Sequence, residues 1–372
     1  MNIVFVNSCP YMGGAEMWHL RTALAFRERG HAVNMLVRPG PLAERAREAG
    51  LSVTTLPMGF DLDLYSFARA FMFFKKLRPD VVLLNDQREC RTVAPAAALA
   101  GVPVRVQRKG WPFLKGSWRD RLIYRHAVKH VIANSEDIAA LFRAKSGLPS
   151  ERIAVFANGF DLARFRPADS PDEKKECRKK WDASEAGIVL GTASRLVEQK
   201  GLPLLIDAVR VLTDIGIDAT LVVAGEGRLE SDLLSRAEQK GVLDRVRLAG
   251  RVDDMPSFLQ ALDVFVFASL SEGRSNALAE ALATGLPVVA TDIPGNAELV
   301  KNEKNGLLVP LEDTRAFADA VKRLVEDSAL REELSGEARR LALRELDQEK
   351  ILAELEDHLC ALVREANKDR KE

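Results

Sequence analysis

The chain has 372 residues, of which 47% are apolar and 29% are charged, and its formal net charge is zero. This composition is that of an ordinary globular protein, and no apolar run approaches the length of a membrane span, which argues against a transmembrane protein. The length exceeds what one hydrophobic core comfortably serves and therefore predicts two domains.

The cysteines indicate a reducing compartment. They lie far apart and form no CxxC or metal-binding spacing, at positions Cys9, Cys90, Cys177 and Cys360. We therefore expect reduced thiols in a cytoplasmic protein. The apolar stretch at residues 1–7 has no basic segment before it, and Gly13 and Gly14 follow it closely, so it predicts a first strand and not a signal peptide.

The two halves of the chain differ in charge. Residues 1–165 hold 24 Lys and Arg against 14 Asp and Glu, whereas the remainder holds 30 against 40. A basic half suits an anionic membrane surface, an acidic acceptor or nucleic acid, while ordinary variation of surface charge is the alternative.

In chain order, short apolar runs alternate with longer amphipathic ones, which is typical of parallel α/β architecture. In the first half we expect strands at residues 3–7, 33–37, 52–56, 81–84, 104–107 and 130–133. Helices are expected at 15–29, ended by Gly30, at 42–49, ended by Gly50, and at 137–146, capped by Ser135.

The pattern restarts in the second half. Strands are expected at residues 188–193, 219–224, 246–249, 264–267 and 287–291, with helices at 202–215, 229–240 and 255–261. Two successive doubly wound sheets are therefore predicted. The charge-dense segment 167–187 is expected to be a linker with one short helix, preceded by a turn at 158–161. Apolar residues at helical spacing in 348–366 predict a helix that covers an apolar surface.

Three of the expected strands end in loops suited to ligand binding. Gly13 and Gly14 let the backbone approach a bound group ahead of a helix N-terminus, although a plain tight turn is the alternative. Arg195 and Lys200 follow a buried strand and can neutralise a diphosphate, or they are two solvated charges. Gly225 lies in a glycine-flanked loop after the next strand.

Two further features complete the predicted site. Arg251 and Val252 follow another strand and can lie along a base edge. Glu272 and Glu280 lie eight residues apart across a loop-to-helix junction, where carboxylates beside the helix N-terminus attract sugar or ribose hydroxyls. A packed Ala-rich helix with one solvated Glu is the alternative. We expect these groups to converge on a crevice between two domains.

In order and spacing, Gly13–Gly14, Arg195 with Lys200, Gly225 and the Glu272/Glu280 pair resemble the family-4 retaining glycosyltransferases of the GT-B fold. The resemblance covers essentially the whole chain and is strongest over residues 191–300. It implies an α/β protein of two Rossmann-like, doubly wound domains facing across a cleft. The implied domains are acceptor-binding 1–165, donor-binding 166–347, and a C-terminal helix, 348–372, that packs back on the first.

The resemblance also implies residue roles. Arg195 and Lys200 would hold the donor diphosphate and stabilise the leaving group, Glu280 would bind the ribose hydroxyls, and Glu272 would contact the donor sugar. Backbone amides near Gly14 and near the helix start would touch the phosphates, the latter at Asn276, Ala277 and Leu278. No metal and no cofactor other than the nucleotide-sugar substrate is expected, because the cations and helix dipoles supply the electrostatics.

The chain departs from the family on the acceptor side. Where many members carry a histidine after the strand 104–107, this chain has Arg108 and Lys109, and Asn85–Asp86 replaces histidines after 81–84. Asp86, Arg108 and Lys109 are therefore candidates for acceptor-side chemistry, Asp86 and Lys109 as catalytic residues, although Lys109 is equally well a plain surface residue.

The same region mixes cations with aromatic residues. Residues 105–130 combine many basic side chains with Trp111, Phe113, Trp118 and Tyr124, which suits a membrane interface or a lipid-linked phosphorylated glycan. The Phe-rich helix at 65–78 either anchors at such an interface or packs its Phe face on the sheet, and we favour packing. No signature of nucleic-acid binding accompanies the patch.

The sequence thus predicts an enzyme that moves a sugar, with retention, from a UDP-, GDP- or ADP-linked donor to a glycan or lipid-linked glycan acceptor in cell-envelope or lipopolysaccharide synthesis. Its expected location is the cytoplasm, with peripheral contact at the inner face of the anionic cytoplasmic membrane left open. The alternatives are a nucleotide-sugar epimerase of the same fold and a catalytically silent nucleotide-sugar-binding protein. An NAD-dependent oxidoreductase is disfavoured, because the fingerprint glycines lack the required spacing.

Overall fold

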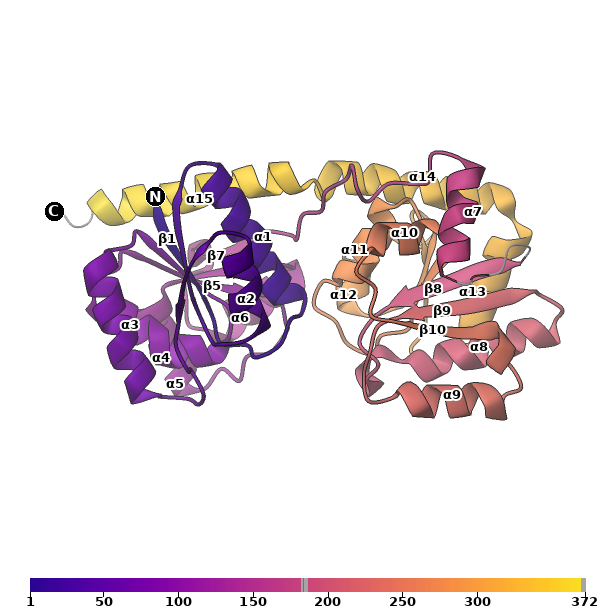
Figure 1. Cartoon of the computed structure of the whole chain (residues 1–372), viewed down its shortest axis with the longest axis horizontal. Helices are drawn as coiled ribbons and strands as arrows, with labels where there is room; N and C mark the ends of the chain where they lie inside the picture. Colours follow the sequence, from indigo (N-terminus) through magenta and orange to yellow (C-terminus); the bar gives the residue numbers. More distant parts are fainter. Residues whose placement is uncertain (182, 184–186, 369–372) are drawn as a thin grey trace. The chain divides into compact units, whose positions relative to one another are not determined.

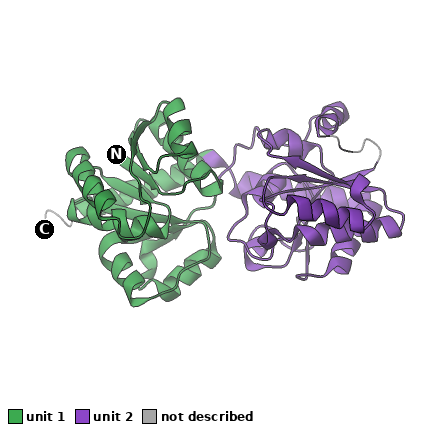
Figure 2. Ribbon diagram, turned by 60° about the horizontal axis from the view of Figure 1, so that its bottom comes forward, with its two compact units in different colours: residues 1–158, 349–372 green, residues 159–348 purple. Residues whose placement is uncertain are grey.

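The computed structural model describes residues 1–181, 183 and 187–368 (Figure 1). It divides into two compact units (Figure 2). Unit 1 comprises Met1–Asn158 with Glu349–Glu372, and unit 2 comprises Gly159–Gln348. Each unit is built on a parallel sheet covered by helices, so the predicted pair of doubly wound sheets is confirmed.

In unit 1, the described residues form a seven-stranded sheet in the order β3-β2-β1-β4-β5-β6-β7. Every pairing is parallel. The strands are β1 (Asn2–Asn7), β2 (Ala32–Val37), β3 (Ser52–Thr55), β4 (Val81–Leu84), β5 (Val104–Lys109), β6 (His130–Ala133) and β7 (Ile153–Val155).

Helices cover both faces of this sheet. Buried side chains of α1 (Gly14–Glu28), α2 (Pro41–Glu48) and α15 (Gln348–Lys368) pack on one face. Those of α3 (Leu64–Leu77), α4 (Gln87–Leu99), α6 (Glu136–Lys145) and the π-helical turn Tyr124–Val128 pack on the other. The short α5 (Trp118–Ile123) leads into that turn, and a 3₁₀ turn, Ser150–Arg152, precedes β7.

Helix α15 belongs to the core of unit 1, although it is the last element of the chain. Its residues Leu352, Leu355, Leu359 and Leu362 are buried in the cluster that contains β1 and α1. Glu356 accepts hydrogen bonds from Arg29 at 3.0 Å and from the His31 ring at 2.7 Å. Apolar spacing on one helix face thus produces a helix that completes the sheet's cover.

The described part of unit 2 contains a six-stranded parallel sheet in the order β10-β9-β8-β11-β12-β13. The strands are β8 (Ile188–Ala193), β9 (Ala219–Ala224), β10 (Val246–Gly250), β11 (Val264–Phe267), β12 (Val288–Thr291) and β13 (Leu307–Val309). Helices α8 (Leu202–Asp214), α9 (Glu230–Gln239) and α13 (Thr314–Glu326) pack on one face. On the other face lie α10 (Met255–Gln260), α11 (Asn276–Ala283) and much of α14 (Ser328–Glu345).

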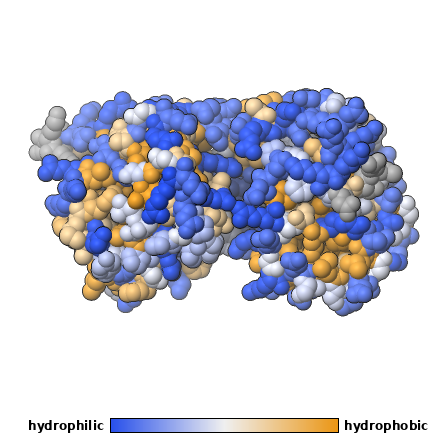
Figure 3. Space-filling view, viewed as in Figure 1, coloured by the Kyte–Doolittle hydropathy of each residue, from blue (hydrophilic) through white to orange (hydrophobic). Residues whose placement is uncertain are grey.

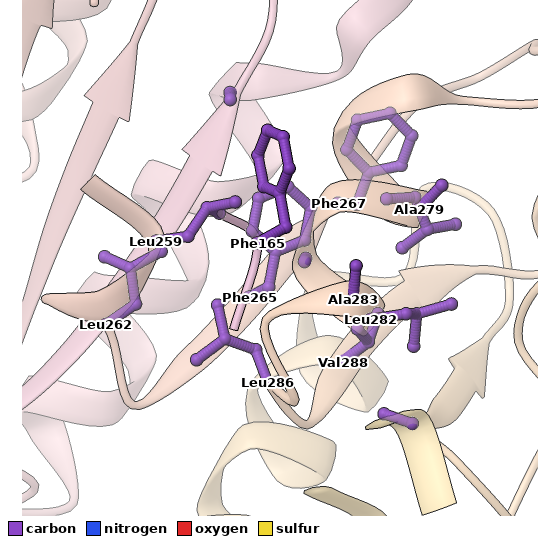
Figure 4. Packing of buried hydrophobic residues seen from close by; sticks show 14 of the residues in the cluster. Phe165, Leu259, Leu262, Phe265, Phe267, Ala279, Leu282, Ala283, Leu286 and Val288 are labelled. Carbon is purple, nitrogen blue, oxygen red and sulfur yellow. The ribbon is translucent and has the colours of Figure 1, made fainter. Parts of the chain in front are cut away.

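The core on the α11 face is dense and aromatic. Figure 4 shows Phe165, Phe265 and Phe267 beside aliphatic side chains of α10 and α11. Phe265 and Phe267 are at most 2% exposed. Such burial of large apolar side chains, at about 25 cal/mol per Å² of apolar area, stabilises the sheet that carries the site loops.

Several predicted boundaries are wrong for identifiable reasons. Strand β5 runs two residues past the expected end, to Lys109, because buried Arg108 and Lys109 continue the ladder with β6. The short helix expected in the linker is present as α7 (Pro171–Lys180), but the segment is part of unit 2 and not a free linker, since Lys174 and Arg178 both pair with Asp263. Residues 182 and 184–186 of that linker lie outside the described residues.

The expected boundary between domains, after residue 165, lies inside unit 2. Phe160, Leu162 and Phe165 are buried in its core, so the structure divides the chain earlier, after Asn158. The favoured interpretation of the Phe-rich helix is confirmed, because Phe74 is 1% exposed and its neighbouring phenylalanines pack against the same core.

Candidate functional site

Unit 2 has a topological switch point between β8 and β11, which are neighbours in the sheet. The chain leaves β8 for α8 on one face and leaves β11 for α11 on the other. In open α/β sheets, ligands bind in the crevice that such a divergence opens at the carboxyl ends of the strands. The residues Arg195, Lys200, Glu272 and Glu280 all follow these two strands.

Three glycines bring the loops at this edge into direct backbone contact. A Cβ on Gly225 would lie 1.8 Å from the Ser194 carbonyl oxygen, and Gly225 has φ +134°. A Cβ on Gly201 would lie 2.0 Å from the Ala268 carbonyl oxygen. A Cβ on Gly295 would lie 2.0 Å from the Gly273 carbonyl oxygen. No side chain fits at these distances, so the loops after β8, β9, β11 and β12 form one continuous wall.

Lys200 and Glu272 meet at the centre of this wall. The Lys200 ammonium forms an ion pair with Glu272 Oε1, and the two side chains are 14% and 9% exposed. Lys200 Nζ also lies 5.6 Å from the centroid of the Phe267 ring. Ser269 Oγ donates a hydrogen bond of 2.6 Å to the same Glu272 oxygen. A cation and a carboxylate are thus held together in a partly desolvated position.

Arg195 lies on the loop that also carries Lys200, and it is exposed. Among the described residues, its guanidinium makes no hydrogen bond or ion pair, whereas its carbonyl accepts from the Val197 amide at 2.9 Å. The fork of guanidinium N–H groups therefore remains available for an anionic ligand.

Helix α11 begins at Asn276, and Ser275 is its cap. Ser275 Oγ accepts a hydrogen bond of 3.4 Å from the Leu278 amide. The Leu278 amide, one of the predicted phosphate contacts, therefore already has a partner within the protein. The first-turn amides of Asn276 and Ala277 lie at the positive end of the helix. Glu280 is half-buried in the following turn.

Arg251 and Val252 lie next to the loop of Gly225. The Gly225 amide donates to the Gly250 carbonyl at 2.7 Å, which joins the ends of β9 and β10. Arg251 is exposed and its Nε donates to Asp253 at 3.2 Å, while Val252 packs against the core. The structure therefore brings the predicted donor residues of unit 2 along one edge of one sheet.

Unit 1 has its own switch point, between β1 and β4, and its own carboxylates fill it. Glu16 accepts side-chain amide bonds from Asn7 at 3.3 Å and Asn85 at 3.2 Å. Glu89, fully buried, accepts backbone N–H bonds from Ser8 at 2.6 Å and from Asn85 and Asp86. Burial raises the pKa of Glu89 to about 8, although these donors act in the opposite direction.

Gly13 and Gly14 begin α1 beside this cluster. Gly13 is the N-cap, with φ −144°, and a Cβ there would lie 3.0 Å from Glu16 Oε2. Asp86 is the exposed N-cap of α4, where its carboxylate accepts from the Gln87 amide at 2.7 Å in a capping box with Glu89. A capping role thus explains an acidic residue at position 86 without any catalysis.

Lys109 is buried, at 7% exposed, so the alternative of a plain surface lysine is wrong. Among the described residues, its ammonium has no hydrogen bond or ion pair, which is unusual for a buried cation. Arg108, its neighbour, lies 4.8 Å from the Trp18 ring and donates to Asn158 at 2.6 Å. Burial lowers the pKa of Arg108 to about 10.

Sequence reasoning missed three polar residues that support Glu272, namely Ser269, Thr291 and Asn296, all fully buried. Their signal was present, because each is a polar residue at or within a few residues of the end of β11 or β12.

No group of three His, Cys, Asp or Glu residues that could hold a metal occurs among the described residues. The absence of a metal in the reaction remains a prediction. In the same part of the chain, no helix combines the length and apolarity that a bilayer span requires.

Two family models match the chain. "Glycosyltransferase Family 4" matches residues 12–164, and "Glycosyl transferases group 1" matches residues 173–341. The chain is 30% identical to the lipopolysaccharide core biosynthesis glycosyltransferase LpsE of Rhizobium meliloti over 342 residues, which cover 91% of this chain and 93% of LpsE.

It is also 28% identical, over 89% of each chain, to the UDP-Gal:alpha-D-GlcNAc-diphosphoundecaprenol alpha-1,3-galactosyltransferase of Escherichia coli. The crystal structure of Anabaena Alr3699/HepE in complex with UDP superposes with a TM-score of 0.85 at 23% identity, covering 97% of this chain and all of the other. These relatives transfer sugars, which confirms the predicted glycosyltransferase over the epimerase. The chain belongs to the family-4 glycosyltransferases and has their GT-B architecture of two Rossmann-like domains.

Proposed function

We propose that this enzyme transfers a sugar, with retention at the anomeric carbon, from a nucleoside diphosphate sugar to a glycan or lipid-linked glycan of the cell envelope. The observation that carries this proposal is the Lys200–Glu272 pair at the switch point of unit 2, with the exposed Arg195 on the same loop. The names of two relatives support the acceptor class, since one acts in lipopolysaccharide core biosynthesis and another on a diphosphoundecaprenol-linked sugar.

In this proposal Arg195 and Lys200 bind the donor diphosphate. The bond between the anomeric carbon and the phosphate oxygen breaks, and negative charge grows on the leaving diphosphate. Two cations at that position, one forked and one a point charge, stabilise the charge in a partly desolvated site without a metal. The amides of Asn276 and Ala277 add the positive end of α11.

The remaining donor contacts follow the wall of loops. Glu280 binds the ribose hydroxyls, and Glu272 accepts hydrogen bonds from hydroxyl groups of the donor sugar near the reacting carbon. Gly225, Arg251 and Val252 lie at the β9–β10 end of the same edge, where they would border the base. The UDP-galactose donor in the name of the galactosyltransferase relative supports uracil as that base.

On the acceptor side we propose Lys109 as the catalytic-site cation. It ends β5 at the carboxyl edge of unit 1, buried and with no ionic partner in the described part of the chain. A phosphate or carboxylate of the acceptor would supply the missing counterion. The acceptor hydroxyl forms the new bond to the anomeric carbon, and its proton passes to an oxygen of the leaving diphosphate.

We further propose that unit 1 contacts the anionic inner face of the cytoplasmic membrane. Large apolar side chains are exposed before α3 and around α5, with Phe60 at 65%, Leu62 at 68% and Trp118 at 71%. Arg91 joins the two segments, because it pairs with Asp61 and lies 3.5 Å from Asp120. Figure 3 shows hydrophobic surface over the side of unit 1 that carries α3 and α4.

Exposed cations flank these apolar side chains, at Lys115, Arg119, Arg121 and Arg125. Aromatic anchors with adjacent cations bind anionic headgroups, at about 1 kcal/mol for each cation. Arg105, Arg108 and Tyr124, which the sequence pattern included in this patch, are buried and contribute nothing to it. Trp118→Ser with Phe60→Ser should abolish sedimentation with phosphatidylglycerol vesicles, whereas Leu343→Ser, at a residue 54% exposed in unit 2, should not. Equal binding by all variants would exclude this surface.

A thermal-shift panel tests the donor. UDP, GDP and ADP, each with and without a hexose, are compared at equal concentrations, and the correct donor stabilises the fold by about 2.7 kcal/mol at 100 times its Kd. Lys200→Ala should abolish that stabilisation. If no nucleotide stabilises the protein, or if an epimerised sugar nucleotide accumulates without transfer, the proposal is wrong.

A further inference from the structure

The oxygen Oε1 of Glu272 has two donors of different kinds. Lys200 Nζ pairs with it, and Ser269 Oγ donates to it at 2.6 Å. Lys200 and Glu272 are slightly exposed, whereas Ser269 is 0% exposed. One donor is therefore a cation at the edge of the site, and the other is a hydroxyl buried in the core.

Resting on the function proposed above, we propose that Ser269 is a positioning residue for Glu272. When the donor diphosphate draws Lys200 away, the Ser269 hydroxyl alone holds Oε1, and the other carboxylate oxygen, Oε2, stays aimed at the sugar. Without Ser269, the carboxylate would turn with Lys200 toward the diphosphate, and the sugar would lose its fixed partner.

The structure holds Ser269 itself from two sides. Thr291 Oγ1 donates to the Ser269 carbonyl at 2.6 Å, and Asn296 Nδ2 donates to the Thr291 carbonyl at 2.9 Å. On the other side, the Leu270 amide donates to the Gln199 carbonyl at 2.8 Å, and Gln199 Nε2 donates to the Ser271 carbonyl at 2.6 Å.

These bonds distinguish Ser269 from an ordinary buried serine. Asn296 begins the chain of contacts on α12 (Pro294–Ala297), whose Gly295 packs against the backbone at Glu272. Thr291 ends β12, and Ser269 follows β11. The ends of two strands and one helix thus converge on the backbone of Ser269. Its hydroxyl donates to the carboxylate at 2.6 Å and lies 3.3 Å from its other acceptor, the Gln199 carbonyl.

The test separates binding of the nucleotide from transfer of the sugar. Ser269→Ala should bind the nucleoside diphosphate that best stabilises the wild type with a Kd within about twofold, because Arg195 and Lys200 remain. Its kcat should fall by about 10- to 100-fold, the loss that misplacement by about an ångström produces. Ser335→Ala is the matched control, since Ser335 Oγ donates to a backbone carbonyl of unit 2 outside the site.

Ser269→Thr keeps the hydroxyl and should restore kcat. If the added methyl prevents folding, Thr291→Val provides the second variant, because it removes the bond to the Ser269 carbonyl at nearly constant volume and should lower kcat by a smaller factor. Wild-type kcat in folded Ser269→Ala would overturn the positioning role, and so would an equal loss of nucleotide affinity and kcat. Full nucleotide affinity in Lys200→Ala would instead overturn the proposed donor site.

Discussion

The buried carboxyl of Glu89 predicts that unit 1 loses stability as the pH rises. Its pKa in the fold is about 8, against an ordinary value of 4.5, so between these values the folded state holds a proton that the unfolded state has released. The contribution of this proton to the stability of unit 1 is therefore full below about pH 4.5 and is lost as the pH rises through 8. At about 1.4 kcal/mol for each pH unit, the free energy of unfolding falls by on the order of 5 kcal/mol over this window.

Glu89→Gln removes the titrating group and resembles the protonated acid, so this variant should lose most of that pH dependence. Three of the four tryptophans lie in unit 1, at Trp18, Trp111 and Trp118, and the fourth is Trp181 in unit 2. Urea unfolding followed by tryptophan fluorescence in a Trp181→Phe background therefore reports unit 1. Equal slopes of unfolding free energy against pH, with and without Glu89→Gln, would refute the reasoning.

Three further substitutions test separate parts of the structure. Gly225→Ala should destabilise unit 2 by at least about 3 kcal/mol, because the added Cβ would overlap the Ser194 carbonyl, and it should abolish nucleotide binding in a thermal-shift assay. The control Gly216→Ala, at a glycine with φ +82° and open space around it, should cost only about 1 kcal/mol. Asp86→Asn should preserve both stability and transfer rate, since Asn caps helices as well as Asp does. Asp86→Ala should lower the free energy of urea unfolding by about 1 kcal/mol. Loss of transfer in folded Asp86→Asn would show a direct catalytic role. Leu355→Ala should lower the free energy of unfolding of unit 1 by about 2–4 kcal/mol. Leu343→Ala, at a residue of α14 that is 54% exposed, should lower the free energy of unfolding by less than about 0.5 kcal/mol. A similar loss for both variants would argue against α15 as part of the core.

The sequence predicted both sheets except for the edge strands β7 and β13, because the other strands are short apolar runs with turn residues at each end. These two strands have only three residues each, too few for a recognisable pattern. The sequence also predicted Lys200 and Glu272 in one site, since residues that follow parallel strands gather at the carboxyl ends of a sheet, but their ion pair is a finding of the structure. Local patterns failed where charges are buried. Arg108 and Lys109 resemble a loop, yet they extend β5, because Trp18 and Asn158 compensate the guanidinium through contacts that no local pattern encodes.

The same limitation explains α7. Its charge density resembles a solvated linker, but Lys174 and Arg178 both reach Asp263, 89 and 85 residues away in sequence. Cys177 on the same helix is buried, and Lys180 pairs with Asp254, so several contacts attach the segment to unit 2. Long-range ion pairs of this kind leave no periodicity for a sequence pattern to detect.

The two switch points explain why the acidic half is the better host for an anionic donor. Residues 166–372 carry ten more acidic than basic side chains. Because salt screens exposed charges beyond about 8 Å, the groups at the β8–β11 crevice itself decide the potential that a diphosphate meets there, namely exposed Arg195 and the Lys200–Glu272 pair. In basic unit 1 the equivalent crevice already holds Glu16 and Glu89, whose carboxylates take the N–H donors that a phosphate would use. The local donors at each switch point, and not the net charge of each half, therefore favour unit 2 for the nucleotide.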